Sequence, residues 1–166
     1  MKKAIVLALA VMLTLSLAVP AAAEGSPVAA ETSPAITAPL PEVVESETKN
    51  ADGSVVTVTP VDANKQDLTK DEKDAMAKAQ QNQKEGAEGL KSTLNLFYAR
   101  VVKTNSDGTT TKDAKGSMTI KVDNPENIVA RQFIGGKWVK LKVVVNTDGT
   151  VTISGIQNGP LLIGIE

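Results

Sequence analysis

The chain has 166 residues, with 18 Lys and Arg against 19 Asp and Glu, and a formal net charge of −1. It contains no cysteine and no histidine, which excludes disulfides, a Ser–His–Asp triad, a Cys–His dyad and an ordinary zinc site. The near balance of charge argues against nucleic acid and anionic membranes as partners, because both select strongly basic surfaces.

Residues 1–23 have the three parts of a cleavable secretory signal. Lys2 and Lys3 give a basic start, an uncharged apolar run follows, and small residues end at Ala23. We therefore expect cleavage between Ala23 and Glu24. The alternative is an uncleaved anchor, but the run is short for a span of about 20 residues, and no later stretch is apolar enough to cross a bilayer. The sequence predicts a secreted protein, extracellular or loosely associated with the cell wall.

Residues 24–50 have the composition of a disordered tail or spacer. They hold four prolines among Ala, Ser and Thr, and five glutamates against one lysine. Such a segment buries too little apolar surface to offset its ordering entropy, and its prolines and like charges keep it extended. It is either a spacer or a tolerated tail. The single domain is expected over 51–166.

A helix is predicted over 69–85. Thr69 and Glu72 have the spacing of a capping box, in which each side chain satisfies a backbone donor of the other residue. Gly86 is the expected stop. The apolar side chains on one face are Ala75, Met76 and Ala79. This stripe is thin, which predicts light packing against a neighbouring element.

Short runs rich in β-branched residues, separated by turn signals, fill most of the remaining domain. Met118, Ile120 and Val122 alternate with polar residues, which is the period of a half-buried strand. Gly135-Gly136 suits a tight hairpin, and Asn146–Gly149 suits a second one. The expected strands cover 54–59 up to Pro60, 94–103, 118–122, 128–134, 137–145, 151–154 and 161–165. This spacing predicts a mainly β fold, an antiparallel immunoglobulin-like β-sandwich with one N-terminal α-helical segment.

Trp138 breaks the alternation of its strand. Val139, Leu141, Val143 and Val145 share one face, which places Trp138 on the opposite face. Either Trp138 is exposed, or a β-bulge near Val139 returns it to the core. Burial of a tryptophan removes up to about 250 Å² from water, so we favour the bulge.

Three motifs occur together in the C-terminal part of the chain. They are Gly136-Lys137-Trp138, the run Val145-Asn146-Thr147-Asp148-Gly149-Thr150-Val151-Thr152-Ile153, and a closing apolar strand. With them the chain resembles C-terminal immunoglobulin-like β-sandwich modules of secreted and surface proteins from Gram-positive bacteria, closely over 116–166 and loosely over 54–103. Gly159-Pro160 departs from that pattern. The resemblance implies a β-sandwich and no particular activity, since this fold hosts many roles.

Carboxylates are the catalytic residue type that remains. They hydrolyse glycosides in other proteins, but that reaction usually needs an aromatic cleft, and this chain has only four aromatic residues. Asp107, Asp123 and Asp148 lie in loops, yet their spacing is that of turns rather than of a calcium loop. We expect no metal and no cofactor. A Lys–Asn bond, found in some Gram-positive sandwich domains, is not expected because Asn158 precedes the closing strand.

Tyr98 and Trp138 form the candidate ligand surface, because exposed rings stack on sugars, although core filling is the commoner fate of such rings. The sequence favours a non-catalytic exported structural or ligand-binding module. Its partner would be a cell-wall glycan or an exported protein. Two alternatives stay open: a small secreted carboxylate-dependent glycoside hydrolase, and a subunit that assembles through an exposed strand edge.

Overall fold

A computed structural model describes residues 40–64 and 67–166, which form two antiparallel sheets and two short helices. The elements in chain order are β1 (Glu42–Glu45), β2 (Glu47–Lys49), β3 (Val55–Val61), α1 (Lys70–Gln81), α2 (Gln83–Gly86), β4 (Ser92–Thr104), β5 (Thr110–Thr111), β6 (Gly116–Lys121), β7 (Ile128–Ile134), β8 (Lys137–Lys140), β9 (Lys142–Val145), β10 (Thr150–Ile156) and β11 (Gly159–Ile165). The expected signal over 1–23, its cleavage point and the spacer up to residue 39 lie outside the described residues. Neither α1 nor α2 has the length and apolar character that a bilayer crossing requires.

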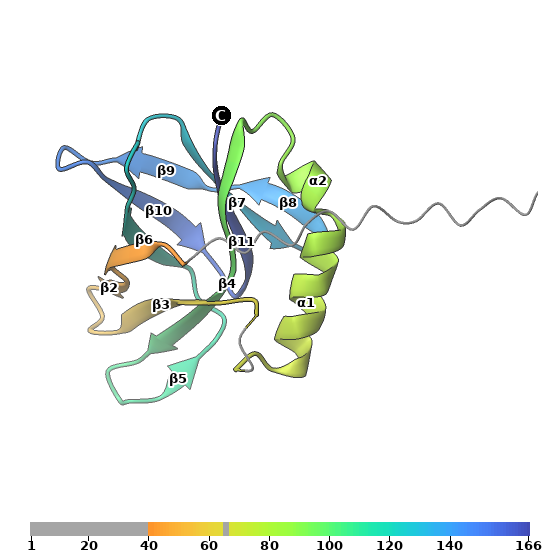
Figure 1. Ribbon diagram of the computed structural model, residues 1–166. Coiled ribbons are helices and arrows are strands. Elements are labelled where there is room, and N and C mark those ends of the chain that lie inside the picture. The colour runs from red at the N-terminus through yellow and green to blue at the C-terminus, as the bar shows by residue number, and fades with distance from the viewer. Residues whose placement is uncertain (1–39, 65–66) are drawn as a thin grey trace, which may run out of the picture. The chain divides into compact units, whose positions relative to one another are not determined.

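The strands divide into a smaller and a larger sheet (Figure 1). The smaller sheet has the order β1-β6-β10-β9, and the larger has the order β2-β3-β4-β11-β7-β8, with β5 paired to β4. Every pairing is antiparallel. The prediction of a mainly β fold with antiparallel sheets arranged as a sandwich is confirmed. The single helix predicted over 69–85 is two helices, α1 and α2, that divide at Asn82. The last strand, β11, lies in the middle of the larger sheet between β4 and β7.

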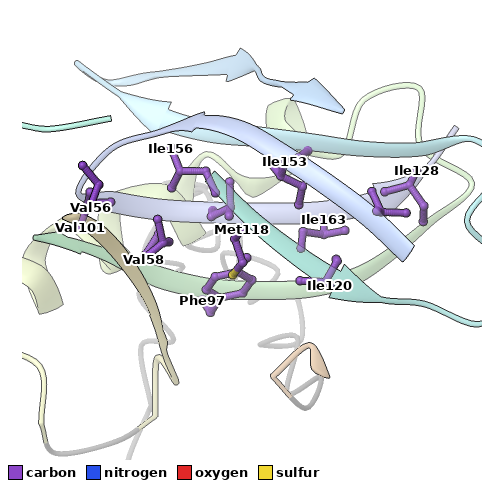
Figure 2. Packing of buried hydrophobic residues seen from close by; sticks show 14 residues of the cluster. Val56, Val58, Phe97, Val101, Met118, Ile120, Ile128, Ile153, Ile156 and Ile163 are labelled. Carbon is purple, nitrogen blue, oxygen red and sulfur yellow. The ribbon is translucent and has the colours of Figure 1, made fainter. Parts of the chain in front are cut away.

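The space between the sheets is filled by apolar side chains, most of them aliphatic. In β4, Phe97 and Val101 face the smaller sheet and are fully buried, as the strand period of two requires. Figure 2 shows Met118 of β6 directed at Phe97. Alternation in β6 and β10 supplies the opposing layer, so one continuous core joins the two sheets.

The other face of the larger sheet is covered by α1. Met76 is buried there against Leu96 and Leu162 in a second, smaller cluster. The predicted capping box is present: the Thr69 hydroxyl accepts from the Glu72 N–H, and the Glu72 carboxylate accepts from the Thr69 N–H at 2.8 Å. Met76 and Ala79 are the buried residues of the helix, so the thin stripe packs as predicted.

The prediction of disorder over 24–50 was wrong at its C-terminal end. Residues 42–45 and 47–49 form β1 and β2, one in each sheet. Val43 packs against the core between the sheets, while Glu42, Glu45 and Glu47 stay exposed. Composition averages over the segment and therefore misses one half-buried valine, Val43, that packs against the core.

Pro60 does not stop β3, which continues to Val61. Backbone bonds from Asn50 to Ser54 and from Val58 to Ser46 place the even-numbered residues of β3 toward β2. The backbone nitrogen of Pro60, which carries no hydrogen, lies on that same side. Since β2 pairs only with residues 55–57, no described strand there needs a hydrogen bond from residue 60. Proline is tolerated at such an edge position.

The strand expected over 137–145 is two strands in different sheets. Leu141 separates β8 of the larger sheet from β9 of the smaller one, and its N–H donates to the Ala130 carbonyl oxygen at 2.8 Å. Figure 1 shows β8 and β9 lying end to end. The bulge predicted near Val139 was wrong, because β7 and β8 pair without a register shift. Trp138 is instead covered by α2, which lies over its own face of the strand. Sequence periodicity did not predict a helix at that position.

Candidate functional site

Trp138, the first residue of the predicted ligand surface, joins β8 to α2. Its indole N–H donates to the Asn82 carbonyl oxygen at 2.9 Å, and its ring lies 5.3 Å from that of Phe133. A Cβ atom added at Gly86 would come within 2.5 Å of the ring, so glycine is required there for close approach. The indole is thus half-buried, and its one polar group already has a partner.

Tyr98, the second residue of that surface, is 8% exposed and belongs to the cluster beneath α1. Burial raises the pKa of its phenol above the ordinary value, with the Glu72 carboxylate adding to the effect. The structure therefore brings Tyr98 and Trp138 into one cluster between helix and sheet. This placement favours the core-filling alternative over an open platform for sugars.

Three aspartates serve turns that share one sequence pattern, Asn-x-Asp-Gly-Ser/Thr. In each turn the aspartate accepts hydrogen bonds from the N–H and the hydroxyl of the residue two positions later. The aspartates are Asp52, Asp107 and Asp148. These donors hold the pKa of each carboxyl below its ordinary value, and that of Asp52 is lowered to about 2. The sequence analysis assigned Asp107 and Asp148 to turns but missed the threefold repeat, which is visible as a pattern.

The calcium candidates Asp107, Asp123 and Asp148 are not gathered into one site. Within residues 40–64 and 67–166, no three His, Cys, Asp or Glu side chains come together in a metal-binding arrangement. The side chain of Asn158 makes three hydrogen bonds with backbone groups. Its oxygen accepts from the Val101 N–H, and its amide nitrogen donates to the carbonyl oxygens of Val101 and Lys112. It fastens β4 to the segment before β6.

Two glutamates with shifted pKa values are held by cations. Glu72 accepts two bonds from the Arg100 guanidinium, at 3.0 and 2.8 Å, and this contact lowers its pKa. Glu166 accepts from Lys140 and lies 3.6 Å from Arg131, which lowers its pKa as well. A glycosidase acid needs a raised pKa, so these shifts have the wrong direction for that chemistry.

An open hollow of about 410 Å³ lies where the ends of β1, β4, β6 and β11 meet. Leu94, Val122 and Ile165 form its apolar floor and pack against the core, while Glu42 and Lys121 stand at its rim. Glu42 and Lys121 are 3.7 Å apart and exposed. Asn95, Asp123 and Asn124 also line the hollow, Asn95 half-buried and the other two exposed.

Exposed large hydrophobic side chains of the described part lie on strands at sheet edges. They are Val44 on β1, Val139 on β8, and Val144 and Val145 on β9. The last two are 42% and 49% exposed. Because β8 and β9 follow one another, Lys137–Val145 forms one edge, which we call the β8–β9 edge. Three successive valines signal it in the sequence, since both faces of that strand are apolar.

The β8–β9 edge also presents backbone hydrogen-bonding groups. In the β9–β10 hairpin the Asn146 N–H donates to the Thr150 carbonyl oxygen. Antiparallel pairing alternates from that point, so Val144 and Lys142 bond to β10, whereas the N–H and C=O groups of Val143 and Val145 point away from it. An added strand would find these groups aligned.

Comparison of the chain with protein-family models, with curated proteins and with solved structures found no match.

Proposed function

We propose that the protein is a non-catalytic, exported structural or binding module whose contact surface is the β8–β9 edge. The observation that carries this proposal is the position of the exposed valines beside outward-pointing backbone groups on β9. Exposed strand edges bind extended segments of other chains through main-chain hydrogen bonds, with apolar side chains adding affinity.

The chemistry of the described side chains supports a role without catalysis. Every carboxyl group with a shifted pKa has that pKa lowered, because it accepts hydrogen bonds in a turn, a helix cap or an ion pair. The alternative of a glycoside hydrolase needs two facing carboxyl groups, one of them with a raised pKa. Turnover of a panel of glycans that includes peptidoglycan is expected to be absent. Turnover that a single Asp→Asn or Glu→Gln change abolishes would replace this proposal with the hydrolase.

A protein strand fits the edge better than a glycan does. The rings that could stack on sugars are held between helix and sheet, and the indole N–H of Trp138 is already bonded. A strand, in contrast, would satisfy the outward backbone groups of Val143 and Val145. Of the two partners expected from the sequence, the exported protein is therefore the one we propose.

Strand addition is tested by amide hydrogen exchange on the purified protein. The probe is a hexapeptide of alternating threonine and valine, which has no sequence relation to a particular partner. Its addition should slow exchange at the Val143 and Val145 amides and leave those of Val43 and Val44 unchanged. Slowing at β1 alone, or at neither edge, would contradict the proposed contact surface.

Export rests on the basic start, apolar run and small-residue end of the first 23 residues. Expression of the full chain in a secreting bacterium should yield a product in the medium that begins at Glu24, as intact mass would show. Ala23→Trp should block cleavage, because the site requires a small residue. A product that keeps Met1 and stays inside the cell would contradict export.

A further inference from the structure

The two edges of the smaller sheet are built differently. The edge strand β1 carries Glu42 and Glu45 and has a register shift between Val43 and Glu45. Charges and irregular pairing are devices by which natural sheets prevent strand addition. The opposite edge strand, β9, pairs with β10 without a shift, and its one charged residue is Lys142 at its start. The smaller sheet is thus closed to pairing at β1 and open at β9.

We propose that β9 pairs antiparallel with β9 of a second copy of this chain, so that two four-stranded sheets join across a two-fold axis. This inference rests on the proposed function and names the occupant of the same edge. A two-fold interface requires a surface that complements itself. The sequence and pairing of β9 meet that requirement in one particular register.

The register follows from the backbone groups that β9 leaves free. In an antiparallel pair, outward-pointing residues exchange both hydrogen bonds with residues of the facing strand. Val143 of one copy then lies opposite Val145 of the other, and the reverse holds by symmetry. The two-fold axis passes beside Val144, which faces its own equivalent in a non-hydrogen-bonded pair, where side chains approach most closely. Two valine side chains, each 42% exposed in the single copy, would cover each other.

The charges also fit this register. Lys142 of one copy lies opposite Asn146 of the other, so no lysine faces a lysine. Two residues beyond that Asn146 lies the exposed turn residue Asp148. It is the diagonal neighbour of Lys142 across the pair, and its carboxylate has the opposite charge. The contact occurs twice by symmetry. A two-fold β9 pair therefore combines apolar contact at its centre with complementary charge at both ends.

Sedimentation velocity of the purified protein, from micromolar to submillimolar concentration, tests this pairing. The wild-type protein should shift from one copy to two as concentration rises. Val144→Lys places two lysines opposite each other at the axis and should raise the dissociation constant about tenfold or more. Val44→Lys is the matched control, because it makes the same change at the other edge of the same sheet. It should leave the dissociation constant unchanged.

Cysteine substitution tests the register, since the chain has no native cysteine to interfere. Val144→Cys should form a disulfide between copies under mild oxidation, because equivalent residues face each other at the axis. Lys142→Cys should not, since its equivalent lies farther along the facing strand. Cross-linking of the second variant in place of the first would overturn the register.

Each remaining outcome separates this inference from the proposed function. A wild-type protein that stays a single copy throughout, yet shows slowed exchange at Val143 and Val145 with the hexapeptide, would overturn the second-copy pairing and leave strand binding in place. A dimer that Val44→Lys dissolves would place the contact at β1 and overturn it as well. Unchanged melting temperatures of Val144→Lys and Val44→Lys will show that both variants are folded.

Discussion

The two faces of the larger sheet are covered in different ways. Toward the smaller sheet, its buried side chains are aliphatic apart from Phe97, and they pack against Met118 and Ile153 of that sheet. Met118, Ile153 and Ile163 have at most 1% of their surface exposed. Toward the helices, a smaller cluster forms, in which Met76 of α1 packs with the Tyr98 ring and with leucines such as Leu96 and Leu162. The Trp138 ring lies at its margin and stays half-exposed. The first face is covered by a sheet and the second by a thin apolar stripe on α1.

The helix side uses polar contacts where its apolar contacts are few. Arg100 binds the Glu72 carboxylate of α1 through two hydrogen bonds. Arg131 donates to the Gly86 carbonyl oxygen at 3.0 Å, and Trp138 donates to that of Asn82. Hydrogen bonds depend on direction, whereas apolar burial depends on area. The sheet interface holds the larger apolar cluster, whereas on the helix side directional polar contacts fix where the helices sit.

The largest effects are expected when one large buried side chain in each interface is replaced by alanine. Phe97→Ala should lower the free energy of unfolding by about 4 kcal/mol, because the rigid sheets cannot collapse into the cavity. Met76→Ala should lower it by about 2 kcal/mol, because α1 packs lightly and can settle. Urea unfolding of both variants measures the two values. A loss at Met76 equal to that at Phe97 would show that the helix interface is as important as the sheet interface.

A methyl group added beneath Trp138 should have the next largest effect. Gly86→Ala forces the indole away from α2, since the new Cβ would overlap the ring, and should cost about 1–3 kcal/mol. Trp138 emission should shift to the red as the ring enters water. Lys84→Ala, at an exposed position of the same helix, serves as the control and should change neither quantity. Unshifted emission in Gly86→Ala would contradict the packing described.

The ion pair between α1 and β4 should have a smaller, pH-dependent effect. Glu72→Gln should lower the free energy of unfolding by about 1 kcal/mol at neutral pH, because Arg100 is partly exposed and water screens the pair. Arg100 lowers the pKa of Glu72 in the folded protein, so the stabilisation is present above the unfolded pKa of about 4.3 and is lost as pH falls through the lower folded pKa. Urea unfolding from pH 7 to pH 2 should show the difference between wild type and variant closing at the acid end. Glu88→Gln, the same change at an exposed position, is the control and should leave the free energy of unfolding at neutral pH unchanged.

The smallest expected effect lies outside both interfaces, in the first of the repeated turns. The Asp52 carboxyl should titrate by NMR with a pKa of about 2, because the Ser54 hydroxyl and N–H donate to it. Ser54→Ala removes the hydroxyl donor and should raise that pKa toward the ordinary value of about 3.9. A pKa near 3.9 in the wild-type protein would show that the turn is not closed by these bonds.

Much of the fold was predictable because local signals agreed with it. The capping box at Thr69, the glycines at 135 and 136 with φ of 58° and 84°, and the alternation through Met118 and Ile120 each report a local geometry that the fold retains. What failed depended on distant partners. The bulge expected near Val139 assumed that only one face of that strand had cover, and no local pattern announces that α2 lies over Trp138.

The candidate site was harder to predict than the fold. The sequence directed attention to Tyr98 and Trp138 because aromatic rings are scarce, yet scarcity also makes rings valuable for packing. The open edge at β9 depends on which strand ends each sheet, and sheet order is a property of tertiary structure. Three successive valines were visible, but the exposure of Val144 and Val145 could not be known before Leu141 was seen to carry the chain from one sheet to the other.

The central position of β11 has a consequence for the order of events in the life of the chain. Strands β4 and β7 are both synthesised before residues 159–165. Neither can complete its pairing until this segment lies between them. Pairings between distant segments form late, because the intervening loop must first be closed. A ribosome-bound or partly translocated polypeptide thus lacks the middle of its larger sheet. For a chain that is exported, as we propose, this delay keeps β4 and β7 from completing their sheet before residues 159–165 have followed them.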